Sequence, residues 1–297
     1  MDSENVKVSV IVATYHRDIT LKRALDSLKD QTFRDFEAIV VDDNASEEWN
    51  GKVKRITDEI NDFPIRYICN QKNIGAAESR NEGIRRALGE YVSFLDDDDV
   101  YLPEKLEHQY RFMVEGGYDV TLTDLDLYFE NGKLSEHRTR DYIEKYDKDS
   151  LLRYHLLYHM TGTDTLMFRK DYITKINGFG PQNIGDEFYL MQRAIENDGK
   201  IGYLNRCDVK AYVHEGGESL SSGDNKIEGE NALFKHKHQY YHQLDKKDVR
   251  YITMRHYLVL AFAEMRRKRT GAVLKYGMRA FFSAPISCIK MVAERIR

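Results

Sequence analysis

The stretch "YVSFLDDDDVYLP" at residues 91–103 joins a short apolar segment to four consecutive aspartates. The apolar run at 91–95 has the length and composition of a buried β-strand. Like charges at the end of such a strand repel one another unless a positive group lies among them. The stretch therefore predicts a strand that leads directly into a charged site.

Segments with strand and helix patterns alternate on both sides of this stretch. The sequence predicts strands at 6–15, 36–46, 65–70 and 91–95, and helices at 19–32, 47–62, 76–89 and 103–115. Such alternation is typical of right-handed βαβ units. We therefore expect an α/β fold with a mostly parallel central sheet flanked by helices.

Polar residues lie at the ends of three of the predicted strands. They are Thr14 and Tyr15, then Asp42 and Asp43, then the run Asp96–Asp99. In open parallel sheets, ligands bind beyond the carboxyl ends of the strands. One polar strand end is an ordinary loop, but three such ends favour a binding site.

The acidic run has the chemistry of a divalent metal site. Mg²⁺ and Mn²⁺ prefer oxygen ligands, and Mg²⁺ is usually held by one or two carboxylates together with substrate phosphates. The alternative is a solvated turn in which Asp98 or Asp99 caps the helix that starts near Pro103. The run alone does not decide between these two interpretations.

Composition and charge indicate a folded chain with a basic C-terminal part. The 297 residues are 41% hydrophobic and 32% charged, with a net charge of −4. Residues 231–297 contain 15 Lys and Arg against four Asp and Glu, a net charge of +11, which leaves −15 for residues 1–230. This asymmetry predicts a basic extension with an anionic partner of its own.

Several features favour a cytoplasmic location. Cys69, Cys207 and Cys288 are too far apart for a disulfide framework or a cysteine-based metal motif. The N-terminal residues are too polar for a signal peptide, and no apolar run approaches the ~20 residues of a spanning helix.

Five segments together resemble the family 2 glycosyltransferases, which have the GT-A fold. They are "VSVIVATYHR", "VVDDNAS", "NIGAAESRNEGI", "GEYVSFLDDDDVYLP" and "INGFGPQNIGDEFYLMQRA". The sequences of these motifs are most similar to those of the SpsA-like spore-coat polysaccharide transferases. The resemblance implies a GT-A catalytic domain at 1–230, with a nucleotide-binding half at about 1–100 and an acceptor half at about 101–230.

The resemblance also implies roles for individual residues. The nucleotide sugar would contact Thr14, Tyr15, Arg17, Asp43, Arg80, Asp96 and Asp97. Asp98 would bind Mn²⁺ or Mg²⁺, with Asp99 as the alternative ligand because the run permits a shift of one residue. His214 is a further candidate ligand, and Asp164 or Thr163 would contact the donor sugar.

Asp186 and Glu187 precede a segment with helical spacing. Acids in a first helical turn are favoured by the helix dipole alone. In the functional interpretation one of them is the general base that deprotonates the acceptor hydroxyl. We expect Asp186 to have this role, with Glu187 as the alternative.

The resemblance implies an inverting, metal-dependent glycosyltransferase. It would move a sugar from a nucleoside diphosphate to a hydroxyl of a bacterial surface glycan or lipid-linked acceptor. UDP is the nucleotide that we expect. The alternatives are a nucleotidyltransferase acting on sugar phosphates and a catalytically inactive module that binds sugar nucleotides. A nucleotidyltransferase usually has a glycine-rich phosphate loop, which "ATYHRD" at 13–18 lacks.

The segments 251–269 and 272–297 mix apolar and basic positions and predict amphipathic helices, with Pro285 interrupting the second. They would pack on the catalytic domain or in a homodimer, or attach peripherally to the inner face of the cell membrane. In the second case Phe281, Phe282 and Ile286 would insert among the lipids. No nucleic-acid-binding motif is present, so we expect no nucleic-acid partner.

Overall fold

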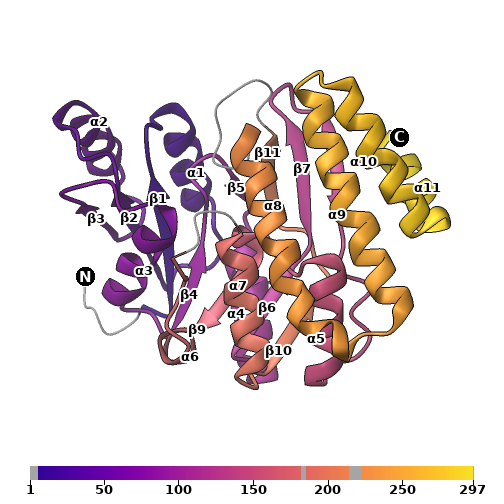
Figure 1. Ribbon diagram of the computed structural model, residues 1–297. Coiled ribbons are helices and arrows are strands. Elements are labelled where there is room, and N and C mark those ends of the chain that lie inside the picture. The colour runs from indigo at the N-terminus through magenta and orange to yellow at the C-terminus, as the bar shows by residue number, and fades with distance from the viewer. Residues whose placement is uncertain (1–5, 182–184, 214–222, 297) are drawn as a thin grey trace. The chain divides into compact units, whose positions relative to one another are not determined.

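The computed structural model describes residues 6–181, 185–213 and 223–296 (Figure 1). The chain divides into two compact units, one of residues 1–152 and 160–215, the other of residues 153–159 and 216–297. Among the described residues, all β-strands belong to the first unit. The two units are therefore considered separately.

The first unit contains both strands and helices. Its strands are β1 (Val8–Thr14), β2 (Phe36–Asp42), β3 (Ile65–Cys69), β4 (Tyr91–Phe94), β5 (Val100–Tyr101), β6 (Val120–Thr123), β7 (Leu125–Phe129), β8 (Leu134–Arg138), β9 (Leu166–Arg169), β10 (Ile201–Leu204) and β11 (Val209–Val213). Its helices are α1 (Ile19–Lys29), α2 (Glu47–Asp58), α3 (Ala76–Arg86), α4 (Lys105–Gly116), the short η2 (Thr163–Thr165), α6 (Lys170–Lys175) and α7 (Asp186–Glu196). Helix α5 (Lys148–Tyr158) has residues in both units.

The central sheet has seven strands in the order β10-β6-β9-β4-β1-β2-β3. Every neighbouring pair is parallel except the two that involve β9, which runs antiparallel to both β4 and β6. The prediction of an α/β fold with a mostly parallel sheet is confirmed. The interior strands are buried along almost their whole length, as expected for strands covered on both faces.

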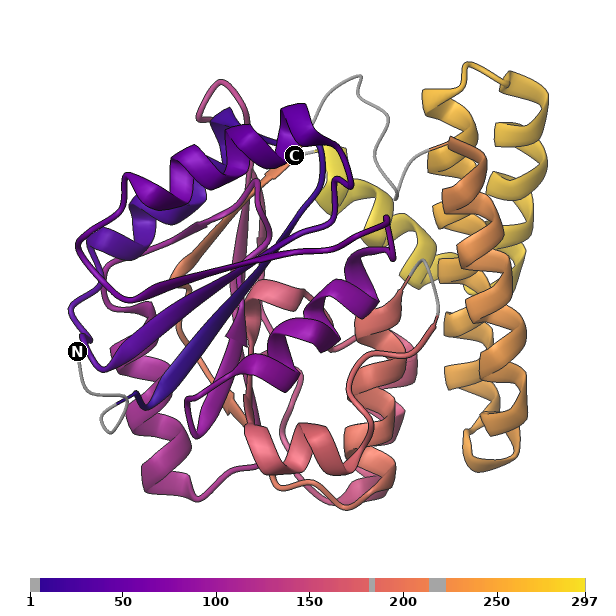
Figure 2. The ribbon, with the colours of Figure 1, turned by 90° about the vertical axis from the view of Figure 1, so that its left-hand side faces the viewer.

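Helices lie on both sides of the central sheet (Figure 2). Alternation along β1 directs its side chains to these two layers. Val8, Val10 and Val12 share one core cluster with the apolar face of α1. Ile11 points to the opposite face, where α3 approaches so closely that a Cβ at Gly83 would lie 2.5 Å from the Ile11 side chain. Helices therefore pack on both faces of the sheet.

A second sheet has the strand order β5-β11-β7-β8. Strand β5 pairs antiparallel with β11, which is parallel to β7. Strand β8 pairs antiparallel with β7 and forms an edge at which all five residues are exposed. The link from β4 to β5 is the acidic run, so that run joins the two sheets.

Strand register brings the three polar strand ends together. Thr14 at the end of β1 is paired with Asp42 at the end of β2. On the other side of β1, Ile11 is paired with Phe94, the last residue of β4. The acidic run therefore begins at the same edge of the sheet as Thr14 and Asp43, as the polar strand ends predicted.

The second unit is helical in the residues described. Its helices are α8 (Gly223–Lys237), η3 (His238–Gln243), α9 (Lys246–Arg266), α10 (Thr270–Ser283) and α11 (Pro285–Ile296). Met254, Leu258, Ala280 and Cys288 form its buried cluster. The predicted boundary between residues 230 and 231 falls within helix α8. A catalytic domain that ends at residue 230 stays a prediction.

The predicted C-terminal helices are present. The predicted interruption at Pro285 appears as the first residue of α11, a position that suits proline because its missing N–H is not needed there. Within the part of the chain that the structure describes, no helix combines the length and the apolar character needed to cross a membrane.

Candidate active site

The acidic run folds into a tight turn at the end of β4. The backbone N–H of Asp99 donates to the Asp96 carbonyl at 3.1 Å. The N–H of Asp96 donates to the carboxylate of Asp164 at 2.6 Å, so η2 supplies a further acid from a distant part of the chain. Carboxylate oxygens of Asp96, Asp99 and Asp164 all lie within 4.8 Å of one another.

These carboxyl groups have raised pKa values. Burial, followed by the charge of Asp96, raises the pKa of Asp164 to about 8. Burial and the neighbouring Asp98 raise the pKa of Asp97 to about 7. Burial also raises the pKa of Asp96 and Asp99, the latter with a contribution from Asp164. The turn thus concentrates carboxylates whose negative charges are poorly compensated by protein groups.

This donor set fits a hard divalent cation. Asp96, Asp99 and Asp164 offer several oxygens in a small space and no nitrogen or sulfur, which matches the preference of Mg²⁺ and Mn²⁺. A cation there would favour the ionised form of each carboxyl group. The alternative ligand Asp99 lies in this group of three, as does Asp164, which the sequence analysis had considered for the donor sugar.

Asp98, the first-choice metal ligand, is held by arginines. The Arg17 guanidinium lies 3.5 Å from its carboxylate. Arg23 donates to the Asp98 carbonyl at 2.5 Å and stacks 3.8 Å over the ring of Tyr212. The sequence analysis missed Arg23, because an arginine in the middle of an amphipathic helix has the pattern of an ordinary surface residue.

Arg80 connects two predicted site residues. From α3, its guanidinium lies 2.7 Å from a carboxylate oxygen of Asp96 and 3.0 Å from one of Asp186. Only 12% of the Arg80 side chain is exposed, so the two ion pairs lie largely out of water. The structure therefore joins the base candidate at the start of α7 to the acidic turn through one cation.

The two acids at the start of α7 differ in their surroundings. Asp186 is buried and is engaged by Arg80. Burial and then the adjacent Asp186 raise the pKa of Glu187 to about 8. A carboxyl group with a pKa in this range is better matched to proton transfer near neutral pH than one held by an arginine.

Asp43 is buried at the end of β2 and accepts three hydrogen bonds. The donors are the side-chain amide of Asn70 at 2.9 Å, the Ile74 N–H at 2.9 Å and the Gly75 N–H at 2.8 Å. Gly75 has φ of 84°, a conformation that favours glycine, and it precedes α3 directly. Asp43 thus fixes the loop that leads to Arg80.

An aromatic stack lies after β1. The exposed Tyr15 ring stacks on His16 with centroids 4.0 Å apart, and His16 stacks on Trp49 at 5.0 Å. The Tyr15 N–H donates to the Asp97 carboxylate at 3.3 Å, while Thr14 beside it is buried. His16 and Trp49 were missed by the sequence analysis, although the single tryptophan after a polar strand end was a usable signal. His214 lies outside the described residues.

Comparisons with known proteins identify the family. The model of the family described as "Glycosyl transferase family 2" matches residues 9–174, more than half of the chain.

The chain is a family 2 glycosyltransferase.

Two curated relatives match most of this glycosyltransferase. An uncharacterized glycosyltransferase of Methanocaldococcus jannaschii is 33% identical over 212 residues, 69% of this chain and 70% of the relative. A UDP-Glc:alpha-D-GlcNAc-diphosphoundecaprenol beta-1,3-glucosyltransferase of Escherichia coli is 27% identical over 72% of this chain and 79% of its own length. Other relatives are matched over less of their length, such as 32% of an uncharacterized glycosyltransferase of Haemophilus influenzae.

Solved structures share the GT-A fold with this glycosyltransferase. S. aureus TarS 1–349 in complex with UDP-GlcNAc has a TM-score of 0.59 at 21% identity, over 94% of this chain and 73% of that one. The mannosyltransferase PcManGT of Pyrobaculum calidifontis, in complex with GDP-Man and Mn²⁺, has a TM-score of 0.58 at 16% identity, over 98% and 87%. These results confirm the predicted fold and family.

The family match covers the candidate donor site of the glycosyltransferase. Arg80, the acidic run and Asp164 all lie within residues 9–174. Asp186 and Glu187 lie outside this range, and the ion pairs of Arg80 connect Asp186 to Asp96 within it.

Replacing Arg80 with methionine should destabilise the folded enzyme by about 3 kcal/mol, because the buried carboxyl groups of Asp96 and Asp186 would lose their shared cation. Arg85→Met on the same helix is the control. Its side chain is 52% exposed and pairs with Glu78 and Glu82, so the expected cost is about 0–1 kcal/mol. Urea unfolding at pH 7 measures both, and equal losses in the two variants would contradict the bridging role.

Proposed function

We propose that the enzyme is an inverting, metal-dependent glycosyltransferase that transfers a sugar from a nucleoside diphosphate to a hydroxyl of a lipid-linked or surface glycan. The observation that carries this proposal is the group of Asp96, Asp99 and Asp164, which Arg80 links to Asp186 at the start of α7. Family membership excludes the nucleotidyltransferase alternative. The inactive-module alternative is tested by the activity measurements below.

We propose a UDP-sugar as the donor. The Escherichia coli relative is named for UDP-Glc and the TarS structure contains UDP-GlcNAc, whereas PcManGT contains GDP-Man, so the fold does not fix the base. A carboxylate has about four acceptor positions, and Asp43 uses three of them within the chain. The remaining position would accept the uracil imide N–H, while Tyr15 offers an exposed aromatic face beside Thr14 and Arg17.

Asp96, Asp99 and Asp164 would hold the divalent cation, with Asp98 next to them. A bound cation would offset the charge that develops on the departing diphosphate. Arg80 would keep Asp96 ionised and in position, since its guanidinium is buried against both acidic groups. Arg17, at 3.5 Å from Asp98, would place a second positive group near the phosphates.

We favour Glu187 as the general base, with Asp186 as the residue that positions it. Asp186, the first choice from the sequence, is committed to Arg80 at 3.0 Å. Glu187 shares the start of α7 and has a pKa raised to about 8. It would remove the proton from the acceptor hydroxyl as that oxygen attacks the anomeric carbon opposite the diphosphate. One displacement of this kind inverts the configuration.

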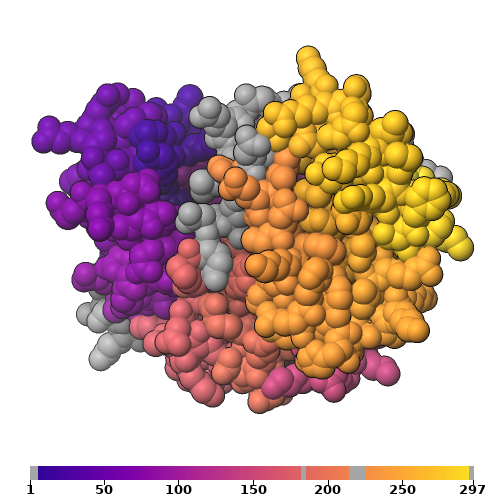
Figure 3. All heavy atoms as spheres, viewed as in Figure 1, coloured from indigo at the N-terminus to yellow at the C-terminus, as the bar shows by residue number. Residues whose placement is uncertain are grey.

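The second unit suggests where a lipid-linked acceptor would be met. Helices α10 and α11 expose a set of large apolar side chains, namely Leu274, Met278, Phe281, Phe282, Ile286 and Ile289. Lys275, Arg279 and Lys290 are exposed among them. In Figure 3 these two helices, in yellow, present a broad surface of the second unit. Exposed apolar groups with interspersed cations fit a membrane surface rich in anionic lipid.

A cavity of about 540 Å³ in the same unit has a cationic lining. Arg153, Lys246, Lys247 and Arg250 line it, together with Ala284 and Ser287 near the α10–α11 junction. Asp248 pairs with Arg153 at 2.7 Å, so the cavity keeps an excess of positive charge. Its chemistry suits the phosphates of a lipid headgroup or lipid carrier beside the apolar face.

Glu187→Gln should lower transfer about 10²–10⁴-fold, the usual contribution of a general base, while binding of UDP-sugar is retained. For the parent enzyme, kcat/KM should rise about tenfold per pH unit below pH 8 and level off above it, because only the deprotonated base is active. Asp186→Asn is the matched variant. It removes a like charge, so the inflection should move to lower pH. Abolished transfer in Asp186→Asn with full transfer in Glu187→Gln would instead make Asp186 the base.

Mn²⁺ together with UDP should raise the melting temperature of the enzyme, because a ligand of the folded state stabilises it by about 2.7 kcal/mol at a hundredfold excess over its Kd. Asp99→Asn should remove most of this stabilisation, since its amide can still accept the Tyr212 N–H but has no charge for the cation. The exposed Asp62→Asn is the control. A shift that is the same in all three proteins would exclude Asp99 as a ligand.

The enzyme should sediment with vesicles that contain anionic phospholipid and release at high salt, because screening weakens attraction to headgroups. Phe282→Ser with Ile286→Ser should weaken this binding about tenfold or more, since the two side chains are 74% and 85% exposed. Ile19→Ser, which removes an 82% exposed side chain from the first unit, should have no effect. Unchanged binding of the double variant would rule out insertion by α10 and α11.

A further inference from the structure

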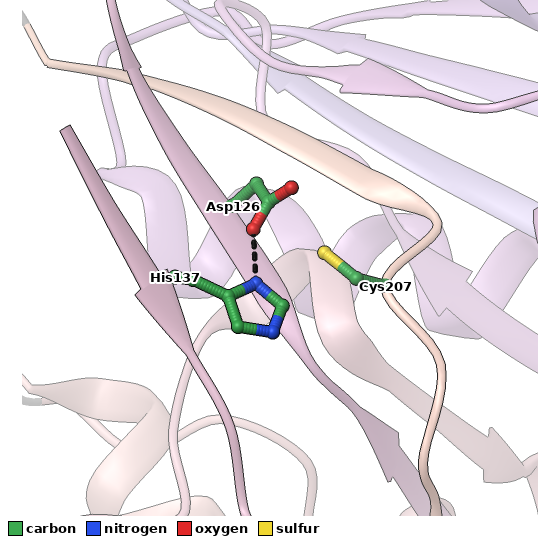
Figure 4. A group of neighbouring side chains, drawn as sticks. All are labelled: Asp126, His137 and Cys207. Atoms are coloured by element: carbon green, nitrogen blue, oxygen red, sulfur yellow. Dashed lines mark hydrogen bonds and ion pairs between the residues drawn. The ribbon is translucent and has the colours of Figure 1, made fainter. Parts of the chain in front are cut away.

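A second cluster of possible metal ligands lies in the four-stranded sheet of the first unit. Asp126 on β7, His137 on β8 and Cys207 in the link between β10 and β11 each direct a donor atom into one small space (Figure 4). The three donor atoms all lie within 4.8 Å of one another. The cluster is separate from the acidic turn and shares no residue with it.

The strand pairing produces this cluster. Antiparallel register sets His137 directly opposite Asp126, so both side chains lie on the same face. On the other side of β7, Lys210 of β11 is the register partner of Asp126, and Cys207 precedes it by three residues. The β7–β8 hairpin and the link before β11 therefore converge next to paired strands, which gives the donor atoms a rigid base.

The chemistry within the cluster favours a cation. His137 Nδ1 is hydrogen-bonded to the Asp126 carboxylate, as the dashed line in Figure 4 marks. The Asp126 carboxylate, the Cys207 sulfur and a His137 nitrogen can each bind a cation. The thiol must release its proton when the cation binds.

We propose that Asp126, His137 and Cys207 form a zinc site whose fourth position is taken by water. Thiolate, imidazole and carboxylate are the ligands that Zn²⁺ combines, whereas Mg²⁺ and Mn²⁺ prefer oxygen alone. At zinc bond lengths, tetrahedral ligand atoms lie about 3.3–3.8 Å apart, so small side-chain rotations suffice from a spread below 4.8 Å.

The surroundings give the ion both access and a role. The His137 side chain is 49% exposed and that of Asp126 is 22% exposed, so an ion can enter from solvent. Strand β8 is an edge whose five residues are all exposed, and its only strand partner in the described sheet is β7. A bond from His137 through zinc to Cys207 ties this edge to the link before β11. The site therefore stabilises the β7–β8 hairpin rather than taking part in sugar transfer.

Cobalt titration of the reduced full chain tests the assignment, because Co²⁺ replaces Zn²⁺ and its bond to a thiolate gives a distinct charge-transfer absorption. We expect this absorption to saturate at one equivalent and to disappear on addition of Zn²⁺. Cys207→Ser and His137→Ala should abolish or strongly reduce it, while Cys69→Ser should retain it. The acidic turn cannot produce this signal, since its ligands contain no sulfur.

Amide hydrogen exchange in β8 gives a second test. Zinc bound elsewhere on the surface would not change this exchange. Zn²⁺ should slow exchange of the amides at 134–138 in the parent chain and not in His137→Ala, whose exposed side chain makes misfolding of the variant a minor concern. Absence of the thiolate band, an unchanged band in Cys207→Ser, or zinc-independent exchange in β8 would each overturn the proposal.

Discussion

Repulsion among the carboxylates at the end of β4 is the constraint to which the surrounding structure responds. Four acids follow a fully buried strand, and Asp164 brings a fifth to the same place. Arg80 and Arg17 each approach one of these carboxylates, while Arg23 binds the backbone of the turn. These cations offset only part of the negative charge, as the raised pKa values of Asp97 and Asp164 indicate. A fold that tolerates such a cost is typical of a functional site.

The central sheet makes this concentration of charge possible. Strands β1, β2 and β4 are parallel neighbours, so their polar ends meet at one edge while their apolar lengths form the core. Residues at that edge and in the loops after it then form the site. Asp43 directly follows β2, and its buried carboxylate fixes the loop before α3 through hydrogen bonds from the loop backbone. The position of Arg80 thus depends on hydrogen bonds made at a different strand end.

The two units carry different kinds of chemistry. The first holds most of the family-matched region and the acidic turn, where arginines pair with buried carboxylates. The second holds a small helical core, exposed apolar residues and most of the excess positive charge. This separation fits the proposed transfer from a nucleotide sugar to a lipid-linked acceptor. In the sequence, residues 1–230 carry a net charge of −15 and residues 231–297 carry +11.

The sequence by itself determined the α/β class, the mostly parallel sheet, the shared edge of three polar strand ends and the C-terminal helices. Each of these follows from local hydrophobic period or from the rule that parallel strands end on the same side. Only the tertiary structure decided that Asp164 joins Asp96 across 68 positions, and that Arg80 reaches Asp186 across 106. It also gave Asp186 and Glu187 different surroundings, since Arg80 pairs with Asp186 alone among the two. It brought Cys207 close to Asp126 and His137. Such contacts depend on how distant segments pack and on the rotation of their side chains. The hydrophobic periodicity of the sequence does not predict them.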